Sequence, residues 1–242
     1  MMDVIRKQIR QRIPLEVRKR AYVFRCHLED VFCGIQFASL DHFDQSFGFS
    51  LVQEQVITPS NNYAQKVHNL ALAIEQIHTV IVKPEQVFSF NRIVGEASPK
   101  RGYQRSRSLH NGVLVQTYGG GLCQLAGLIY QVSLQLGLEI LERHNHSVDI
   151  YTDETRYTPL GSDATIVYPF KDMRIRNNSP FFLRFRFHIM EHKISITVEG
   201  TGPMSLHDIT HQVIQTEPKK IVHTKNSHNE IVAISIYDEL YR

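Results

Sequence analysis

A cysteine that closely follows three glycines has a setting that favours covalent chemistry. Cys123 stands one residue past the glycine run, at the start of a predicted helix over 122–137. A helix N-terminus favours the thiolate form of a cysteine, and consecutive glycines let backbone amides converge on an anion. We therefore expect the loop amides, together with the side chain of Gln124, to bind a developing oxyanion. The three glycines are Gly119, Gly120 and Gly121.

Two histidines are predicted to return to the level of this cysteine. A helix from Cys123 to Gly137 is about 21 Å long, and the residues after it alternate with the period of a strand. At about 3.3 Å per residue, less the residues used in turning, such a strand regains the level of Cys123 near His144 and His146. Their neighbours on that strand face are apolar, apart from Glu142, so these polar side chains need partners. The pattern predicts a functional site.

Three interpretations of these residues remain open. In the first, Cys123 is a nucleophile, one histidine is its base, and Asp163 or Asn145 orients the imidazole. In the second, the two imidazoles bind a metal ion, and Cys123, Glu142 or Asp163 completes the coordination. In the third, the histidines are structural and the glycine run is only a tight turn. A phosphate-binding P-loop is excluded, because no Gly-Lys-Ser/Thr follows the glycines.

The elements that must position these residues give an α+β pattern. Apolar residues recur at intervals of three and four over 61–80, which predicts a helix with Ser60 as its N-cap. The fold class is therefore predicted to be α+β, with N-terminal helices followed by a mostly antiparallel sheet packed on a central helix. Alternation with a period of two predicts the strands at 138–150, 181–189, 194–198, 219–223 and 230–237.

The first 25 residues are strongly basic. They hold eight Lys/Arg against Asp3 and Glu16, a net charge of +6, and since the whole chain carries +3 the rest sums to −3. Residues 1–35 are predicted to be a basic amphipathic helical N-terminus, and residues 50–242 a single α+β domain. Such a helix either lies on an anionic membrane surface or docks on the domain by its apolar side. No nucleic acid is expected, because the basic residues are not interleaved with aromatic ones.

The composition is that of a globular protein, with 42% hydrophobic and 21% charged residues. No run of 18 apolar residues and no secretory signal is present. We therefore expect a cytoplasmic protein, with peripheral attachment to the inner membrane face through residues 1–25 as an alternative. Three cysteines do not make a disulfide scaffold. Cys26 and Cys33 are expected to be buried structural thiols.

Six short motifs are spread over the middle of the chain. They are FSFNRIVG (88–95), RGY (101–103), GGGLCQ (119–124), GLEILERHNHS (137–147), PLGSDA (159–164) and RNNSP (176–180). Their order and wording resemble the VanW family of bacterial proteins, most strongly over residues 60–190. The resemblance implies a link to cell-wall or peptidoglycan metabolism, or to glycopeptide resistance, without naming a substrate. Two of the motifs depart from the family's usual residues. Ala126-Gly127 stand where Ser-Thr is frequent, and Ser162 stands where Arg is common.

The function expected from these residues is thiol-dependent acyl transfer to, or hydrolysis of, a peptide. Cys123 would attack the peptide carbonyl, His146 or His144 would take the proton, and Asp163 would hold the imidazole. The ligand is expected to be a peptide or an anionic small molecule, with no metal and no cofactor. The alternative is a non-catalytic accessory module at the inner membrane surface that binds an anionic ligand in the same pocket. The expected substrate-binding residues are Gly119, Gly120, Gly121, Gln124 and Arg143.

Overall fold

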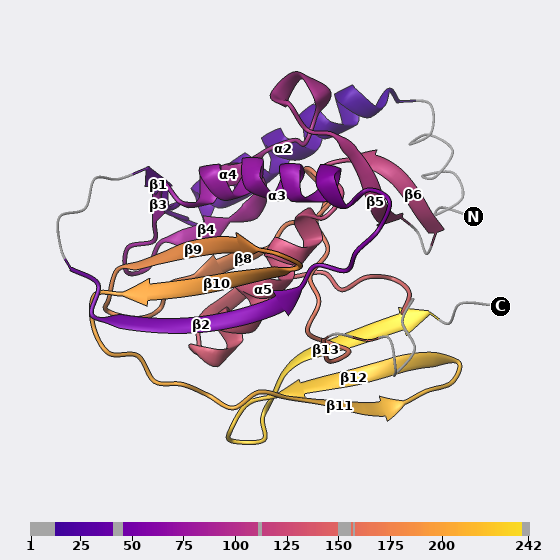
Figure 1. Ribbon diagram of the computed structural model, residues 1–242. Coiled ribbons are helices and arrows are strands. Elements are labelled where there is room, and N and C mark those ends of the chain that lie inside the picture. The colour runs from indigo at the N-terminus through magenta and orange to yellow at the C-terminus, as the bar shows by residue number, and fades with distance from the viewer. Residues whose placement is uncertain (1–12, 41–45, 111–112, 150–155, 157, 239–242) are drawn as a thin grey trace. The chain divides into compact units, whose positions relative to one another are not determined.

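The chain divides into two compact units, Met1–Gln36 and Phe37–Arg242 (Figure 1). The computed structural model describes residues 13–40, 46–110, 113–149, 156 and 158–238. Among these residues, no helix is both long enough and apolar enough to cross a membrane.

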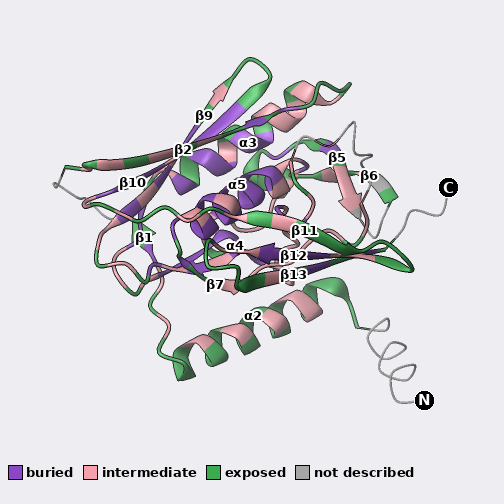
Figure 2. Cartoon of the chain, turned by 90° about the horizontal axis from the view of Figure 1, so that it is seen from below, coloured by how far each residue is buried: buried purple, intermediate pink, exposed green. Residues whose placement is uncertain are grey.

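The described part of the first unit contains one helix, α2 (Leu15–Phe32), which begins directly after Pro14. A proline is tolerated there because the first helical residues need no N–H donor. None of the residues of α2 is buried, and Figure 2 shows the helix in the colours of exposed and intermediate residues. Cys33 is exposed and Cys26 is half-buried, so the expectation of two buried thiols is wrong. The predicted helical segment before residue 13 lies outside the described residues.

The second unit is an α+β domain, as predicted. Its helices are α3 (Tyr63–Ile77), α4 (Phe90–Val94), the 3₁₀ helix η1 (Pro99–Arg101) and α5 (Leu122–Gln135). The first of its three-stranded sheets contains β2 (Phe49–Val56), β10 (Lys193–Gly200) and β9 (Leu183–Met190). The second contains β4 (Val87–Ser89), β8 (Arg174–Arg176) and β7 (Glu139–Glu142). The third contains β11 (Thr210–Gln215), β12 (Lys219–Lys225) and β13 (Ile231–Asp238).

Two further strand pairs complete the described sheets. They are β1 (Ser39–Leu40) with β3 (Val80–Ile81), and β5 (Arg105–His110) with β6 (Val113–Tyr118). All the ladders between these named strands are antiparallel. The strands β1 to β6 precede α5, so helices and strands alternate along the chain more than the sequence pattern suggests.

Helix α5 lies at the centre of the domain core. Eleven of its fourteen residues are buried, and it packs against α3, β2 and β7. Figure 2 shows it among the most deeply buried elements. A helix that is apolar nearly all round is stable only in such surroundings. It begins after Gly121 (φ 104°), and the chain leaves it through Gly137 (φ 63°), two backbone conformations that favour glycine. The first turn, which contains Cys123, is thereby held inside the domain.

The strands predicted at 181–189 and 194–198 are present as the hairpin of β9 and β10. Met190 pairs with Lys193 on either side of the two-residue turn, and β2 pairs with the other edge of β10. The sequence predicts Ser60 as the N-cap of α3, but this helix begins at Tyr63 after Asn62, without a side-chain cap. The alternate hairpin residues that are buried in the core are Leu183, Phe185, Phe187, Ile194, Ile196 and Val198.

The strand predicted over 138–150 is shorter than expected. β7 ends at Glu142, and the next residues up to His146 belong to no strand. The amide of His146 donates instead to the carboxylate of Asp163, at 2.7 Å. The carbonyl of His144 accepts from the amide of Thr165, at 2.8 Å. Because these backbone groups bond to the loop around 163–165, the two histidines lie on an irregular segment with no common strand face.

Candidate functional site

Cys123 is the second residue of α5 and is half-buried. Its Sγ lies 3.5 Å from the amide nitrogen of Ile166, which donates to it, and 3.7 Å from the hydroxyl oxygen of Thr165. Both partners come from the segment that follows Asp163. Donors at these positions stabilise a negative charge on sulfur, so the thiol sits where its thiolate form is favoured.

His146 lies between this thiol and a carboxylate. Its Nδ1 is 2.6 Å from Oδ2 of Asp163, and its own amide bonds to the same oxygen. This double contact fixes the ring and leaves Nε2 as the ring nitrogen available to the thiol. The resulting order, from thiol to imidazole to carboxylate, is that of a cysteine-based catalytic triad.

The electrostatics of the three groups favour an ion pair. Burial alone would raise the pKa of the Cys123 thiol, but its hydrogen bond to His146 and the donors from Ile166 and Thr165 lower it overall. Burial would also lower the pKa of His146, but the hydrogen bonds to Asp163 and Cys123 raise it to about 10. The two directions agree. Together these shifts favour a thiolate beside an imidazolium over the neutral pair.

Asp163 is the anchor of the arrangement. Its Oδ1 accepts from the guanidinium of Arg143 at 3.2 Å and from the hydroxyl of Tyr237. Burial would raise the pKa of this carboxyl, but His146 and Arg143 lower it to about 2. A half-buried carboxylate with donors on both oxygens stays ionised and holds its position. It therefore maintains both the orientation and the charge of the imidazole.

Arg143 supports Asp163. Only 6% of its side chain is exposed, and its guanidinium lies over the ring of Tyr130, 4.6 Å from the centroid. Besides the Asp163 carboxylate, its nitrogens donate to the carbonyls of Asp163 (2.7 Å) and Gly161 (2.9 Å). A further bond goes to the hydroxyl of Ser235 (2.6 Å). These bonds point to a positioning role for Arg143, while the substrate-binding role expected from the sequence stays a prediction.

The side chain of Gln124 is also committed within the protein. Its Nε2 donates to the carbonyl of Val56 at 2.9 Å, so this amide group ties α5 to β2 and is not offered to an oxyanion. Among the described residues, the amide of Cys123 has no acceptor, whereas the neighbouring amides of Leu122 and Gln124 donate to the carbonyls of Gly119 and Gly121. First-turn amides of a helix lack intrahelical partners. The Cys123 amide is thus the oxyanion donor that the geometry favours.

The glycine run is held by two polar residues that the sequence analysis missed. The carbonyl of Gly120 accepts from Nδ2 of Asn69 (3.2 Å) and from the hydroxyl of Ser106 (2.8 Å). A Cβ on Gly120 would lie 2.6 Å from the carbonyl oxygen of Ser106, so only glycine fits there. Gly119, with a φ of 75°, donates its amide to Gln104. A completely buried asparagine within the apolar stripe of a helix is the signal that could have identified Asn69.

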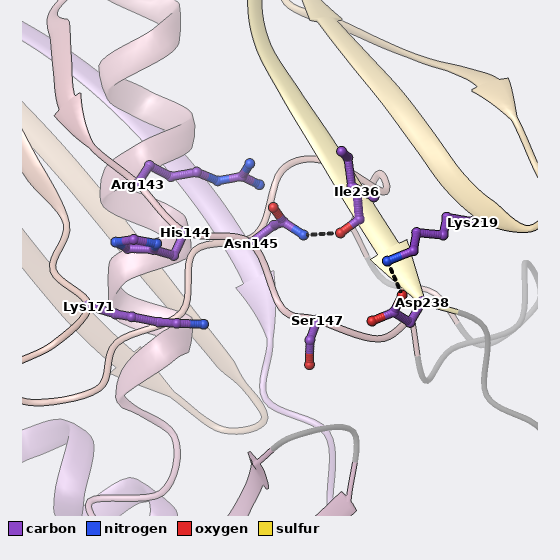
Figure 3. Close-up of a pocket in the computed structure, with 8 residues that line it drawn as sticks. All are labelled: Arg143, His144, Asn145, Ser147, Lys171, Lys219, Ile236 and Asp238. Atoms are coloured by element: carbon purple, nitrogen blue, oxygen red, sulfur yellow. Dashed lines mark hydrogen bonds and ion pairs between the residues drawn. The ribbon is translucent and has the colours of Figure 1, made fainter. Parts of the chain in front are cut away.

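His144 has different partners from His146. Its Nε2 lies 2.9 Å from Oε1 of Glu142, and it lines a neighbouring pocket of about 370 Å³ (Figure 3). That pocket does not include Cys123, His146 or Asp163 among its lining residues. Within the described part of the chain, no three His, Cys, Asp or Glu side chains are grouped as metal ligands. The residues that line the pocket are Arg143, His144, Asn145, Ser147, Lys171, Lys219, Ile236 and Asp238.

Comparison with known proteins places this site in a family. A family model described as "VanW like protein" matches residues 65–199. The chain belongs to this VanW-like family. It is 28% identical over 174 residues to the "Vancomycin B-type resistance protein VanW" of Enterococcus faecalis (strain ATCC 700802 / V583), over 72% of this chain and 60% of that protein. It is 33% identical over 119 residues to the "Uncharacterized protein YoaR" of Bacillus subtilis (strain 168), over 48% of this chain and 38% of that protein.

The chain therefore spans less than two thirds of the length of each of these relatives. No solved structure gives a significant match. The VanW-like region contains Cys123, His146 and Asp163 together with Arg143. Tyr237, which donates to Asp163, lies beyond it on β13. The set of donors to Asp163 is thus completed by a strand from outside the matched region.

Proposed function

We propose that this VanW-like protein is a cysteine-dependent acyl transferase or hydrolase that acts on a peptide. The observation that carries the proposal is the convergence of three groups at the start of a buried helix: a thiol with a lowered pKa, an imidazole with a raised pKa and an ionised carboxylate. A structural histidine needs neither a neighbouring thiol nor an anchored carboxylate. Together they supply the nucleophile and the general acid and base that acyl transfer requires.

The reaction would proceed in two steps. In the first, the Cys123 thiolate attacks the carbonyl carbon of a substrate amide, and the amide of Cys123 donates to the oxyanion. The imidazolium of His146 then gives its Nε2 proton to the departing amine, which leaves an acyl thioester on the sulfur. In the second step, neutral His146 takes a proton from water or from an acceptor amine, which attacks the thioester. The acyl group leaves on the new oxygen or nitrogen, and the thiolate–imidazolium pair is restored.

The substrate class is proposed from the family. One relative carries the name of a vancomycin B-type resistance protein, and this name supports a search among cell-wall peptides. The proposed setting is peptidoglycan metabolism or glycopeptide resistance, and the proposed ligand is a peptide or another anionic molecule.

Peptidoglycan fragments provide the direct test. Soluble fragments from a muramidase digest would be incubated with the protein, and released amines and altered peptides would be read by liquid chromatography and mass spectrometry. Turnover is expected for the native chain and for Cys33→Ala, in which an exposed cysteine is lost, and is expected to disappear in Cys123→Ala. Equal turnover by Cys123→Ala would refute the catalytic role. The alkylation experiments below test the activated thiol without a substrate.

A second proposal is that the first unit binds an anionic membrane surface. At 100° per residue, Val17, Phe24 and Val31 share one face of α2, and all three side chains are exposed. Arg20 and Arg25 follow on opposite borders of this face. An apolar stripe bordered by cations is typical of helices that lie in a membrane interface. The inner membrane face is therefore the proposed site of attachment.

Vesicle sedimentation tests this second proposal. The protein is expected to bind vesicles that contain phosphatidylglycerol and to bind pure phosphatidylcholine vesicles less, because the cations contribute about 1 kcal/mol each near an anionic surface. Phe24→Ser, on the apolar face, should weaken binding. Val23→Ser should not, because this exposed residue lies about 100° away on the helix. Equal effects of the two substitutions would count against an interfacial helix.

A further inference from the structure

Lys66 brings a positive charge to the glycine run beside Cys123. It lies on α3, which packs against α5. Its Cγ, Cδ and Cε lie 2.7, 3.5 and 3.3 Å from the position that a Cβ of Gly121 would occupy. The aliphatic part of the lysine therefore lies on Gly121, two residues before the thiol, and the absence of a side chain there makes room for it.

The ammonium of Lys66 has no carboxylate partner in the part of the chain that the structure describes. Among the described residues, none accepts a hydrogen bond from it or forms an ion pair with it. Burial and the nearby charge of Arg107 lower its pKa to about 8, against the opposing effect of the Cys123 thiolate. A partly desolvated ammonium without an acceptor is costly unless a ligand supplies one.

The thiolate has stabilising partners other than this cation. The hydrogen bond and charge of His146, with donors from Ile166 and Thr165, are the groups that stabilise the sulfur charge. Lys66 and Arg107 add two further positive charges to the same region. One thiolate already paired with one imidazolium leaves this region with a surplus of positive charge. A bound anion would balance it.

We propose that Lys66 binds a carboxylate of the substrate, next to the amide that Cys123 attacks. The inference rests on the proposed function and narrows its substrate class to short peptides with a free carboxylate adjacent to the scissile bond. A terminal carboxylate meets this requirement. Lys66 is then a specificity-determining residue, because it selects the acidic substrate without taking part in bond making.

Two alkylating reagents of the same size test the inference without a known substrate. Iodoacetate carries a carboxylate next to the carbon that the thiolate attacks, whereas iodoacetamide carries a neutral amide. The second-order rate constants of both would be measured at Cys123 at pH 7 by peptide mass spectrometry, in the native chain and in Lys66→Met and Lys66→Arg. The ratio at the exposed Cys33 of the same molecules gives the preference of an ordinary thiol. Lys100→Met is the matched control, since it removes an exposed lysine from η1.

The ratio of iodoacetate to iodoacetamide rates is expected to be higher at Cys123 than at Cys33. It should fall about five- to tenfold in Lys66→Met, as expected for the loss of one ion pair at the edge of a protein, and persist in Lys66→Arg and Lys100→Met. The same ratio in the native chain and in Lys66→Met would overturn the role of Lys66 and leave the proposed function intact, provided that iodoacetamide still modifies Cys123. A native Cys123 that reacts with neither reagent would overturn the proposed function and this inference with it.

Discussion

Replacing Asp163 with asparagine removes the negative charge of the side chain and keeps its shape. The pKa of this carboxyl lies at about 2 against an ordinary 3.8, a difference of about two units or roughly 2–3 kcal/mol of coupling to its surroundings at 1.36 kcal/mol per unit. Because coupling is reciprocal, the imidazolium and the guanidinium lose this stabilisation in Asp163→Asn. His146 and Arg143 share the loss. The thiolate–imidazolium pair is therefore expected to become less stable relative to the neutral thiol and imidazole.

The assay is the pH dependence of iodoacetamide alkylation at Cys123, with Cys33 as an internal reference. At pH 7 the rate at Cys123 should fall about ten- to a hundredfold in Asp163→Asn, the factor that corresponds to the loss of roughly 2–3 kcal/mol from the ion pair. Asp172→Asn is the control, because it also removes a buried carboxyl but one bonded to Ser89 and Asn91. Circular dichroism establishes that both variants are folded. An unchanged alkylation midpoint in folded Asp163→Asn would refute the ion-pair reasoning.

Three further predictions concern stability. Burial raises the pKa of Asp172 to about 6 from 3.8, so between these pH values the native state retains a proton that the unfolded chain releases. The free energy of unfolding should therefore fall by about 3 kcal/mol as the pH rises from 4 to 6. Urea unfolding of Asp172→Asn should lack this fall. Tyr237→Phe removes the hydroxyl that donates to Asp163. The free energy of unfolding of this variant should drop by about 1–3 kcal/mol in the same assay. No change would mean that water replaces the hydroxyl. Gly120→Ala should lower the melting temperature, with a cost of about 1–3 kcal/mol or more, because a Cβ has no room there. Gly48→Ala, where nothing lies within 4 Å, is its control.

Much of this fold could be predicted because the residue patterns that specify it are continuous in the sequence. The glycine run, the helix after it and the closing Gly137 form one continuous pattern, and α5 follows it within two residues. The hairpin of β9 and β10 is equally local, since both strands and their turn are adjacent in the sequence. Strand β2 gave no such signal. It pairs with β10 across more than a hundred residues, and pairing at that separation is decided by the assembled core.

The residues of the site were predicted better than their roles. The sequence indicated Cys123, His146 and Asp163, because a thiol at a helix start and polar side chains on an apolar segment are both visible there. It could not distinguish His146 from His144, since a period of two places both on one face of a strand. The structure distinguishes them through backbone bonds, because Asp163 accepts the amide of His146 and the strand has already ended.

The same argument explains why the contacts of Arg143 and Tyr237 with Asp163 were not predicted. An arginine beside a candidate site suggests an anion ligand, and this expectation holds for an exposed guanidinium. Here the anion is the protein's own Asp163, a half-buried carboxylate that would be costly to keep ionised without several donors. Arg143 and Tyr237 supply two of these donors. Since that carboxylate holds the imidazolium against the thiol, their effect on reactivity should pass through the pKa of Cys123.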